Sequence, residues 1–259
     1  MQVNFPHEID VSEITFSEPK PFGENGGKIV YVKYNDSDIN LQCPTMGVPY
    51  GISKFDDGSR VKFTLDMSFR DKDTNTRVEK LHSLLEEFDN HVLKNAVKSS
   101  TGWFKKKMSK EVLNELITPS VKRAKDKETG EFTDKYPPTF KVKVPWYEGR
   151  FTKPIFHMDS EETLEGDWNE LLSKGATVKT IVSHGGIWFA GGKFGSLWQL
   201  KQVKVNPVDR LVKYAFRDDD GDNNENTDNN ENSEKNENKD NNNSGEYVLD
   251  SEEEEDNEL

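Results

Sequence analysis

Alternating apolar and polar positions run through most of the first 217 residues and predict β-strands. The clearest alternation is in Arg60–Phe69, where Val61, Phe63, Leu65 and Met67 share one face. Successive side chains of a strand point to opposite faces, so a period of two indicates a half-buried strand. The same alternation, or enrichment in β-branched and aromatic residues, predicts further strands at Val11–Glu18, Gly27–Asn35, Asp38–Cys43, Pro138–Trp146 and Gly149–Met158, the last interrupted by Pro154.

A helical period replaces this alternation after residue 75. Apolar residues spaced three or four apart form one stripe of a helix, made of Val78, Leu81, Leu85, Phe88, Val92 and Ala96. Thr76, followed by Glu79, fits a capping box at its start. A shorter helix is predicted over Ser109–Ile117, and Asp167 resembles the cap of a short helical turn.

A long hairpin is predicted near the end of this region. Its arms are "ATVKTIVSHGGIWFA" and "SLWQLKQVKV", joined through "GGKFG". In the second arm Leu197 is in phase with Val203 and Val205, whereas Trp198 and Leu200 have the opposite phase. We therefore expect a bulge or strong coiling there, as occurs where strands bend around a small barrel.

Many short strands around one helical segment favour a mainly β fold. We predict an OB-fold-like Greek-key barrel over residues 1–217, with a helical insertion at about residues 75–118. A β-sandwich is the alternative architecture.

Charge separates a C-terminal tail from this domain. Residues 218–259 hold 18 Asp and Glu against Lys235 and Lys239, a net charge of −16, which leaves +3 on the rest of the chain. The tail is rich in Asn and poor in apolar residues, so we expect it to be disordered. Near its end a short apolar cluster and an acidic run resemble a partner-binding motif, made of Tyr247, Val248, Leu249, Glu252, Glu253, Glu254, Glu255 and Leu259.

Composition argues against several other classes of protein. Cys43 is the only cysteine, and neither a signal peptide nor a membrane-spanning run is recognisable, so we expect an intracellular protein in a reducing compartment. The five histidines are scattered, and we expect no metal site. "AGGKFG" fits neither a Walker A loop nor a dinucleotide fingerprint, because Ile187, Ala190 and Phe194 stand at required positions. We expect no cofactor and no enzymatic activity.

Basic and aromatic residues interleaved on strands are the remaining signal. Single-stranded nucleic acid is bound in this way, because bases stack on aromatic rings and cations follow the phosphates. We slightly favour a core position for Trp188 and Trp198. Trp103 is expected to be exposed beside three lysines, and for Trp146 the core and exposed positions are equally favoured. The candidate binding residues are Tyr31, Lys33, Lys62, Trp103, Lys105, Lys141, Lys143, Trp146, Tyr147, Arg150, Trp188, Lys193, Trp198, Lys201 and Lys204.

The hairpin and the acidic tail together resemble a known family. The pattern W-F-x-x-G-K-F-G-x-x-W-x-x-x-Q-x-K-V, here Trp188–Val205, is similar to one in the single-stranded DNA-binding proteins of nucleo-cytoplasmic large DNA viruses, which are similar to the phage type with an OB-fold. The resemblance implies coating of ssDNA during viral replication, in the host cytoplasm or nucleus. It also implies that the tail contacts replication proteins such as a polymerase or helicase, or a second subunit in a homodimer.

Two other functions stay open. An acidic-tailed chaperone or scaffold for basic proteins would use the tail and ignore ssDNA. An RNA-binding OB-fold protein would use the same stacking surfaces, because stacking does not distinguish the two sugars.

Overall fold

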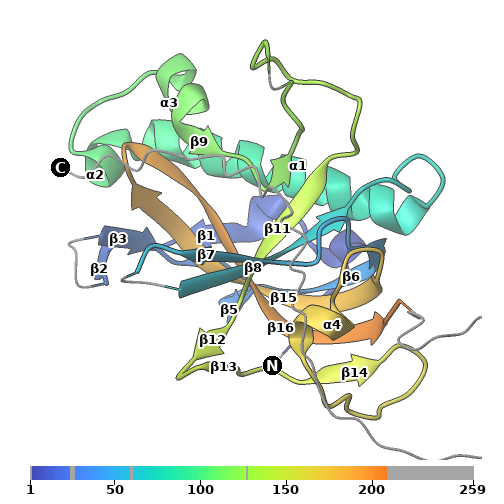
Figure 1. Cartoon of the computed structure of the whole chain (residues 1–259). Helices are drawn as coiled ribbons and strands as arrows, with labels where there is room; N and C mark the ends of the chain where they lie inside the picture. Colours follow the sequence, from blue (N-terminus) through green and yellow to red (C-terminus); the bar gives the residue numbers. More distant parts are fainter. Residues whose placement is uncertain (1, 24–26, 59–60, 127, 209–259) are drawn as a thin grey trace, which may run out of the picture. The chain divides into compact units, whose positions relative to one another are not determined.

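A barrel of five strands is the centre of the computed structural model, which describes residues 2–23, 27–58, 61–126 and 128–208 (Figure 1). The barrel strands are β6 (Asn40–Gly47), β8 (Val61–Ser68), β11 (Thr139–Val144), β15 (Thr177–Ala190) and β16 (Lys193–Asn206). Within the described residues, β6 pairs with β8 and β15, β8 pairs with β11, and β15 pairs with β16, all antiparallel. A parallel contact between β11 and β16 closes the barrel, which confirms the predicted mainly β, OB-fold-like architecture.

Shorter strands extend the barrel or lie beside it. β1, β4 and β5 form a separate small sheet, and β12 pairs only with β13 among the described strands. The bounds are β1 (Ile14–Phe16), β2 (Lys20–Phe22), β3 (Gly27–Val30), β4 (Val32–Tyr34), β5 (Ser37–Asp38), β7 (Ile52–Asp56), β9 (Ile117–Thr118), β10 (Val121–Lys122), β12 (Trp146–Tyr147), β13 (Arg150–Phe151) and β14 (Ile155–His157).

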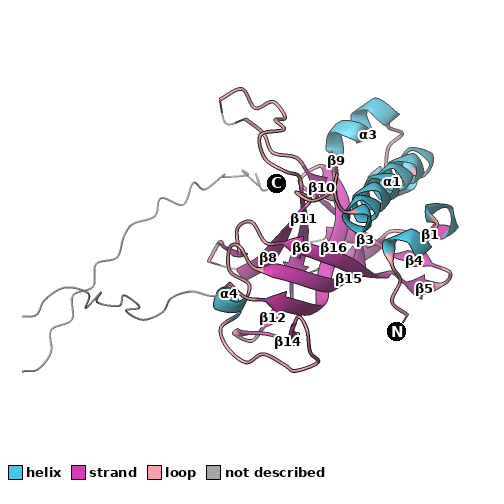
Figure 2. Cartoon of the chain, turned by 90° about the vertical axis from the view of Figure 1, so that its right-hand side faces the viewer, coloured by secondary structure: helices cyan, strands magenta, loops and turns pink. Residues whose placement is uncertain are grey.

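Helices cover one side of the barrel and one of its ends. Figure 2 shows α1 along one side of the barrel, and α4 near β12 at the end of the barrel that lies away from α1. Among the described residues the α-helices are α1 (Thr76–Lys98), α2 (Ser100–Phe104), α3 (Lys110–Leu116) and α4 (Trp168–Leu171), and the 3-10 turns are Pro6–Glu8 and Val11–Glu13. No helix in this part of the chain is long and apolar enough to cross a membrane.

The predicted stripe of α1 is its buried face. Val78, Leu81, Leu85 and Phe88 are buried there, as are Leu84 and Leu93, which lie just beside the stripe. The start of the helix differs from the prediction by one residue. Asn75 is the N-cap, because its side chain accepts the backbone N–H of Arg77 at 3.0 Å. Thr76 is therefore the first helical residue, and the predicted Thr76–Glu79 capping box is wrong.

The phase change in the last hairpin is a pair of register shifts. Ile181 pairs with Gln202 and Val182 pairs with Leu200, so Lys201 is skipped. This extra residue reverses the phase, so that Leu200 and Val203 are both buried and the predicted bulge is confirmed.

The second shift lies around residues 185 and 186 of β15. Gly186 has a φ of +118°, and a Cβ there would lie 2.7 Å from Ile29 Cγ1, so only glycine fits this bend.

Other predicted strands are shorter or divided. Val11–Glu18 begins as a 3-10 turn before β1. Gly27–Asn35 breaks at Tyr31, because β3 joins the barrel sheet through β15 whereas β4 pairs with β1 and β5. Gly149–Met158 is divided at Pro154, as its sequence indicated. The helix predicted over Ser109–Ile117 is confirmed as α3.

A buried polar chain ties α1 to the barrel. The Asp89 carboxylate accepts the backbone N–H of Ser120 at 2.6 Å and the Ser120 hydroxyl at 2.8 Å. The Ser120 hydroxyl oxygen in turn accepts Trp198 Nε1–H at 3.1 Å. Burial raises the pKa of the Asp89 carboxyl from 3.8 to about 7, although the two bonds from Ser120 act to lower it.

Replacing Asp89 with asparagine should change the pH dependence of stability. The folded wild type keeps a proton that the unfolded chain releases above pH 4, so this group contributes less stability as pH rises from about 4 to 7. Asp89→Asn keeps an acceptor for Ser120 and does not titrate. Between pH 5 and pH 8 the variant should gain about 3 kcal/mol relative to wild type, an order-of-magnitude figure.

Urea denaturation at the two pH values measures this difference. His184 is fully buried and burial lowers its pKa to about 3, but it is present in both proteins and cancels in the comparison. Asp36→Asn, at an exposed turn residue, serves as the control. Parallel curves for wild type and Asp89→Asn would contradict the prediction.

Candidate nucleic-acid interface

The outer face of β8 and β11 is basic because the inner face takes the apolar residues. Phe140, Val142 and Val144 are buried in the barrel, so the alternate residues Lys141 and Lys143 point outwards. The register sets Lys143 opposite Thr64, and Lys141 opposite Asp66. Asp66 is buried and lies 3.7 Å from Lys141 Nζ, so the Lys141 charge is partly balanced, whereas Lys143 forms no ion pair with any described acidic residue.

An exposed aromatic ring completes this face on the neighbouring strand. Phe55 of β7 is 55% exposed and pairs with Lys62 of β8. Lys62 Nζ lies 5.5 Å from the centre of the Phe55 ring, which is a cation–π contact. A ring that is open to solvent beside a cation offers a base both a stacking surface and a charge for its phosphate.

Before β11, the loop from residue 123 to 138 carries two more exposed rings. Arg123 and Lys125 lie 5.1 and 5.4 Å from the ring centre of Phe132, and Lys135 lies 5.5 Å from that of Tyr136. The cations of this loop are partly balanced by acidic residues, and Arg123 bonds Asp134 at 3.1 Å.

After β11, the β12–β13 hairpin places another ring and another cation in solvent. Its turn uses Glu148 and Gly149, both with positive φ, which is typical of a tight two-residue hairpin. Tyr147 is 65% exposed, and Arg150 pairs with it across the hairpin. We call the set along this strand the β11 strip: Phe55, Lys62, Arg123, Lys125, Phe132, Lys135, Tyr136, Lys141, Lys143, Tyr147 and Arg150.

β11 itself has six residues and is about 20 Å long at the usual rise of a strand. The strip therefore spans several nucleotides of an extended single strand.

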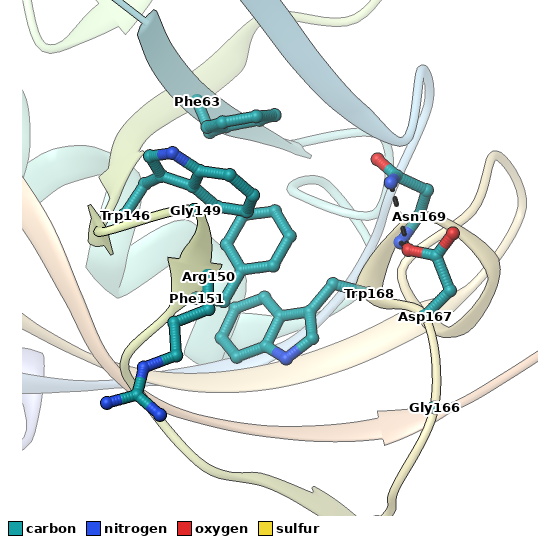
Figure 3. Close-up of a pocket in the computed structure, with 9 residues that line it drawn as sticks. All are labelled: Phe63, Trp146, Gly149, Arg150, Phe151, Gly166, Asp167, Trp168 and Asn169. Atoms are coloured by element: carbon teal, nitrogen blue, oxygen red, sulfur yellow. Dashed lines mark hydrogen bonds between the residues drawn. The ribbon is translucent and has the colours of Figure 1, made fainter.

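Four aromatic rings close the barrel beside the hairpin. The rings of Phe151 and Trp168 are stacked with their centres 4.5 Å apart, and Trp146 meets the edge of Phe151 at 4.7 Å. Phe63 lies 4.6 Å from Trp146. These rings, with Arg150, Asp167 and Asn169, line an open cavity of about 380 Å³, which we call the barrel-mouth pocket (Figure 3).

Two predicted aromatic platforms are in the core. Trp103 is 2% exposed, because α2 turns its ring against Phe16 and Phe189, and the expectation that it is exposed is wrong. Trp198 is 3% exposed and is held by Ser120 and by the ring of Phe88. Neither ring has a face on which a base could stack, so both are removed from the candidate binding residues.

The other predicted residues divide among different surfaces. Five lie on the β11 strip, namely Lys62, Lys141, Lys143, Tyr147 and Arg150, and Trp146 is half-buried beside it. Tyr31 and Lys33 lie near β3 and β4, where Lys33 pairs with Asp38 at 2.7 Å. Lys201 is the half-buried bulge residue, and Lys204 donates to the Ser160 carbonyl at 3.1 Å.

A second basic group lies around the β15–β16 turn. Lys105 and Lys193 are exposed, and Trp188 is half-buried. Lys28 lies 5.1 Å from the ring centre of Phe189 and donates to the Trp103 carbonyl. Burial, and then the charge of Lys105, lower the pKa of Lys28. Because these lysines lie close together, they create a positive potential, and an anion bound among them would relieve their mutual repulsion.

Sequence reasoning missed three aromatic members of the strip, one in the edge strand β7 and two in a loop. Phe55 stands beside the turn "DDG", and Phe132 and Tyr136 lie in a loop that shows no apolar period. Their only signal is an apolar ring among charged residues. The predicted tail residues, from Tyr247 to Leu259, lie outside the described residues. Within those residues, no group of three or more His, Cys, Asp and Glu could hold a metal ion.

Two solved structures show what the fold is similar to. One is the single-stranded DNA-binding protein from bacteriophage Enc34 in complex with ssDNA, with a TM-score of 0.41 and 11% identity over 75% of this chain and 97% of that chain. The other is gp2.5, a single-stranded DNA-binding protein encoded by bacteriophage T7, with a TM-score of 0.43 and 12% identity over 69% of this chain and 92% of that chain. A search among curated proteins finds no match to the sequence.

A family match covers more than half of the sequence. It extends over residues 62–218 and includes β8, β11 and the β15–β16 hairpin. The chain therefore belongs to the family of unknown function DUF5871.

Proposed function

We propose that this protein binds single-stranded DNA along the β11 strip. The observation that carries the proposal is the pairing of exposed rings with cations on and beside the outer face of β8 and β11. In OB-type barrels, the face of the second and third strands and the adjacent loops bind oligonucleotides, and β8 and β11 are the second and third barrel strands here. The role is binding, without a chemical step.

Packing needs do not explain this surface. Single exposed aromatics are common on soluble proteins, but Phe55 and Tyr147 both lie near the end of the β8–β11 face where β8 begins and β11 ends, with Lys62 and Lys143 on that face. Each stacked base contributes about 1–3 kcal/mol, so two or three such rings with several cations are enough for tight binding. The cationic surface also has the wrong sign for a basic protein client.

The biological setting belongs to the same proposal. On the resemblance carried by Trp188–Val205, we place the binding in viral DNA replication, recombination or repair, in the host cytoplasm or nucleus. The acidic residues 218–259 would recruit replication proteins such as a polymerase or helicase, and a homodimer would align two strips on one strand.

Removing a lysine from the strip should weaken binding and its salt dependence. Lys143→Ala should lower the slope of log affinity against log salt by about 0.7, the value for one phosphate contact on a single strand. Fluorescence anisotropy of labelled oligo(dT) at several salt concentrations measures this slope. Lys143 is preferred to Lys141 because removing Lys141 would leave the buried Asp66 carboxylate without its ion-pair partner and would destabilise the fold.

The matched control is Lys33→Ala, which removes an equal charge that is paired with Asp38 on another sheet. An equal loss of slope in both variants would place the interface elsewhere. If neither oligo(dT) nor an RNA of the same length binds at low salt, the proposed function is wrong, and tighter binding of the RNA would assign the strip to RNA.

Removing an aromatic ring from the strip should weaken binding without changing the salt slope. Phe55→Ala should lower the affinity for oligo(dT) by about tenfold, because one stacked base contributes about 1–3 kcal/mol. The matched control is Tyr31→Ala, which removes an exposed ring 5.6 Å from Lys20 Nζ and outside the strip. A loss for Tyr31→Ala with none for Phe55→Ala would move the interface to the side of β3.

Deleting residues 218–259 should raise the affinity for ssDNA at low salt. The tail carries a net charge of −16 against +3 on the rest of the chain, so it competes with DNA for the basic strip or repels the strand. The gain should shrink as salt screens these charges. Equal affinities for the full and shortened chains at low salt would exclude an electrostatic role of the tail.

A further inference from the structure

The barrel-mouth pocket leaves aromatic rings partly exposed around an open cavity, which closure of the barrel does not require. Trp146, Phe151 and Trp168 are only half-buried, whereas rings of the same size, such as Trp198 and Phe140, are buried in the core. They surround an open cavity of about 380 Å³. The mouth of a barrel is a common position for a ligand site, and a cavity of this size holds one planar heterocycle with room for its sugar.

One side of the pocket is polar and offers hydrogen-bond acceptors. Asp167 Oδ1 accepts both the backbone N–H and the side-chain Nδ2–H of Asn169, each at 2.9 Å. Figure 3 shows this pair at one side of the pocket, with the aromatic rings around the other. Among the described residues, no hydrogen bond to Asp167 Oδ2 or Asn169 Oδ1 is present. Both atoms can therefore accept hydrogen bonds from a ligand.

The pocket adjoins the β11 strip. Phe63 lies between Lys62 and Thr64 on β8, and Trp146 and Phe151 are on the same hairpin as Tyr147 and Arg150. Figure 3 shows the Arg150 guanidinium extending away from the ring cluster, where it can meet a phosphate while the base of the same nucleotide turns inwards. A strand that follows the strip therefore passes the mouth of the pocket.

We infer that the barrel-mouth pocket takes one base of the bound strand, and that it prefers a base with an exocyclic amino group. This inference rests on the proposed function of the strip. The rings stack against the base, and the acceptors of Asp167 and Asn169 receive an amino N–H, as cytosine provides at N4. Uracil and thymine present O4 at that position, an acceptor that faces the carboxylate unfavourably.

The test compares oligo(dC) with oligo(dU) of equal length, because cytosine and uracil share ring size and differ at this edge. Wild type should bind oligo(dC) about tenfold or more tightly than oligo(dU), the effect of one hydrogen bond to a charged group. Asp167→Asn should remove or reverse this preference, because it puts an amide donor in the place of an acceptor. Asparagine is also a good helix cap, so α4 keeps its first turn.

The outcomes separate this inference from the proposed function. Equal binding of both oligonucleotides by wild type, or an unchanged preference in Asp167→Asn, overturns the pocket and leaves the strip in place. If neither oligonucleotide binds, the proposed function, ssDNA binding along the β11 strip, is itself wrong. Free deoxycytidine monophosphate tests the source of the base, and its displacement of oligo(dC) at an equal concentration would overturn the assignment to a strand.

A second variant separates stacking from fold. Trp168→Ala should weaken both oligonucleotides by a similar factor, because it removes the stacking ring and leaves the acceptors. The melting temperature, measured for each variant, controls for loss of structure. A Trp168→Ala protein that melts like wild type and binds both oligonucleotides with unchanged affinity would contradict the inference.

Discussion

Closure of the barrel by the β15–β16 hairpin is the constraint on which the rest of the structure depends. β15 pairs with β6 and β3 on one side, and β16 reaches β11 and β14 on the other. Both arms have fourteen residues, which is long for a strand, so they must bend to follow the barrel wall. The extra residue at Lys201 and the glycines at 185 and 186 allow this bend while the apolar side chains stay inside.

Closure also determines which residues can meet a ligand. Once the inner positions of β8 and β11 are buried, their alternate residues have no direction except outwards, and these include Lys62, Lys141 and Lys143. The edge strand β7 and the hairpin after β11 then add rings that the core does not need. The basic and aromatic surface is thus a direct consequence of strand alternation combined with a closed core.

A cluster of buried polar and aromatic groups around Trp198 ties the barrel to α1. Trp198 joins Phe88 of α1, His184 of β15 and Phe140 of β11, and its indole N–H reaches Ser120. A tryptophan in this position links the helix to three parts of the barrel at once. Trp198 thus stabilises, from inside the protein, the barrel wall whose outer surface carries the β11 strip.

Local patterns predicted the elements whose period survives packing. The sequence alone predicted the α1 stripe, the alternation in β8 and β11, the phase change at Leu200, and five basic or aromatic residues of the strip. The cap of α1 was misplaced by one residue, because Asn75 and Thr76 are both good caps and only the backbone path chooses between them.

Sequence alone determined that this chain would build a β-rich barrel with one long helix and an acidic tail, because period and charge are local properties. Only the tertiary structure decided which tryptophans are buried. Trp103 stands beside three lysines in the sequence, yet its ring packs against Phe16 and Phe189, which are 87 and 86 positions away. The barrel-mouth pocket is likewise made by residues from β8, β12, β13 and α4. A stacking site depends on the exposed face of a ring, and that face is set by contacts between segments far apart in the chain.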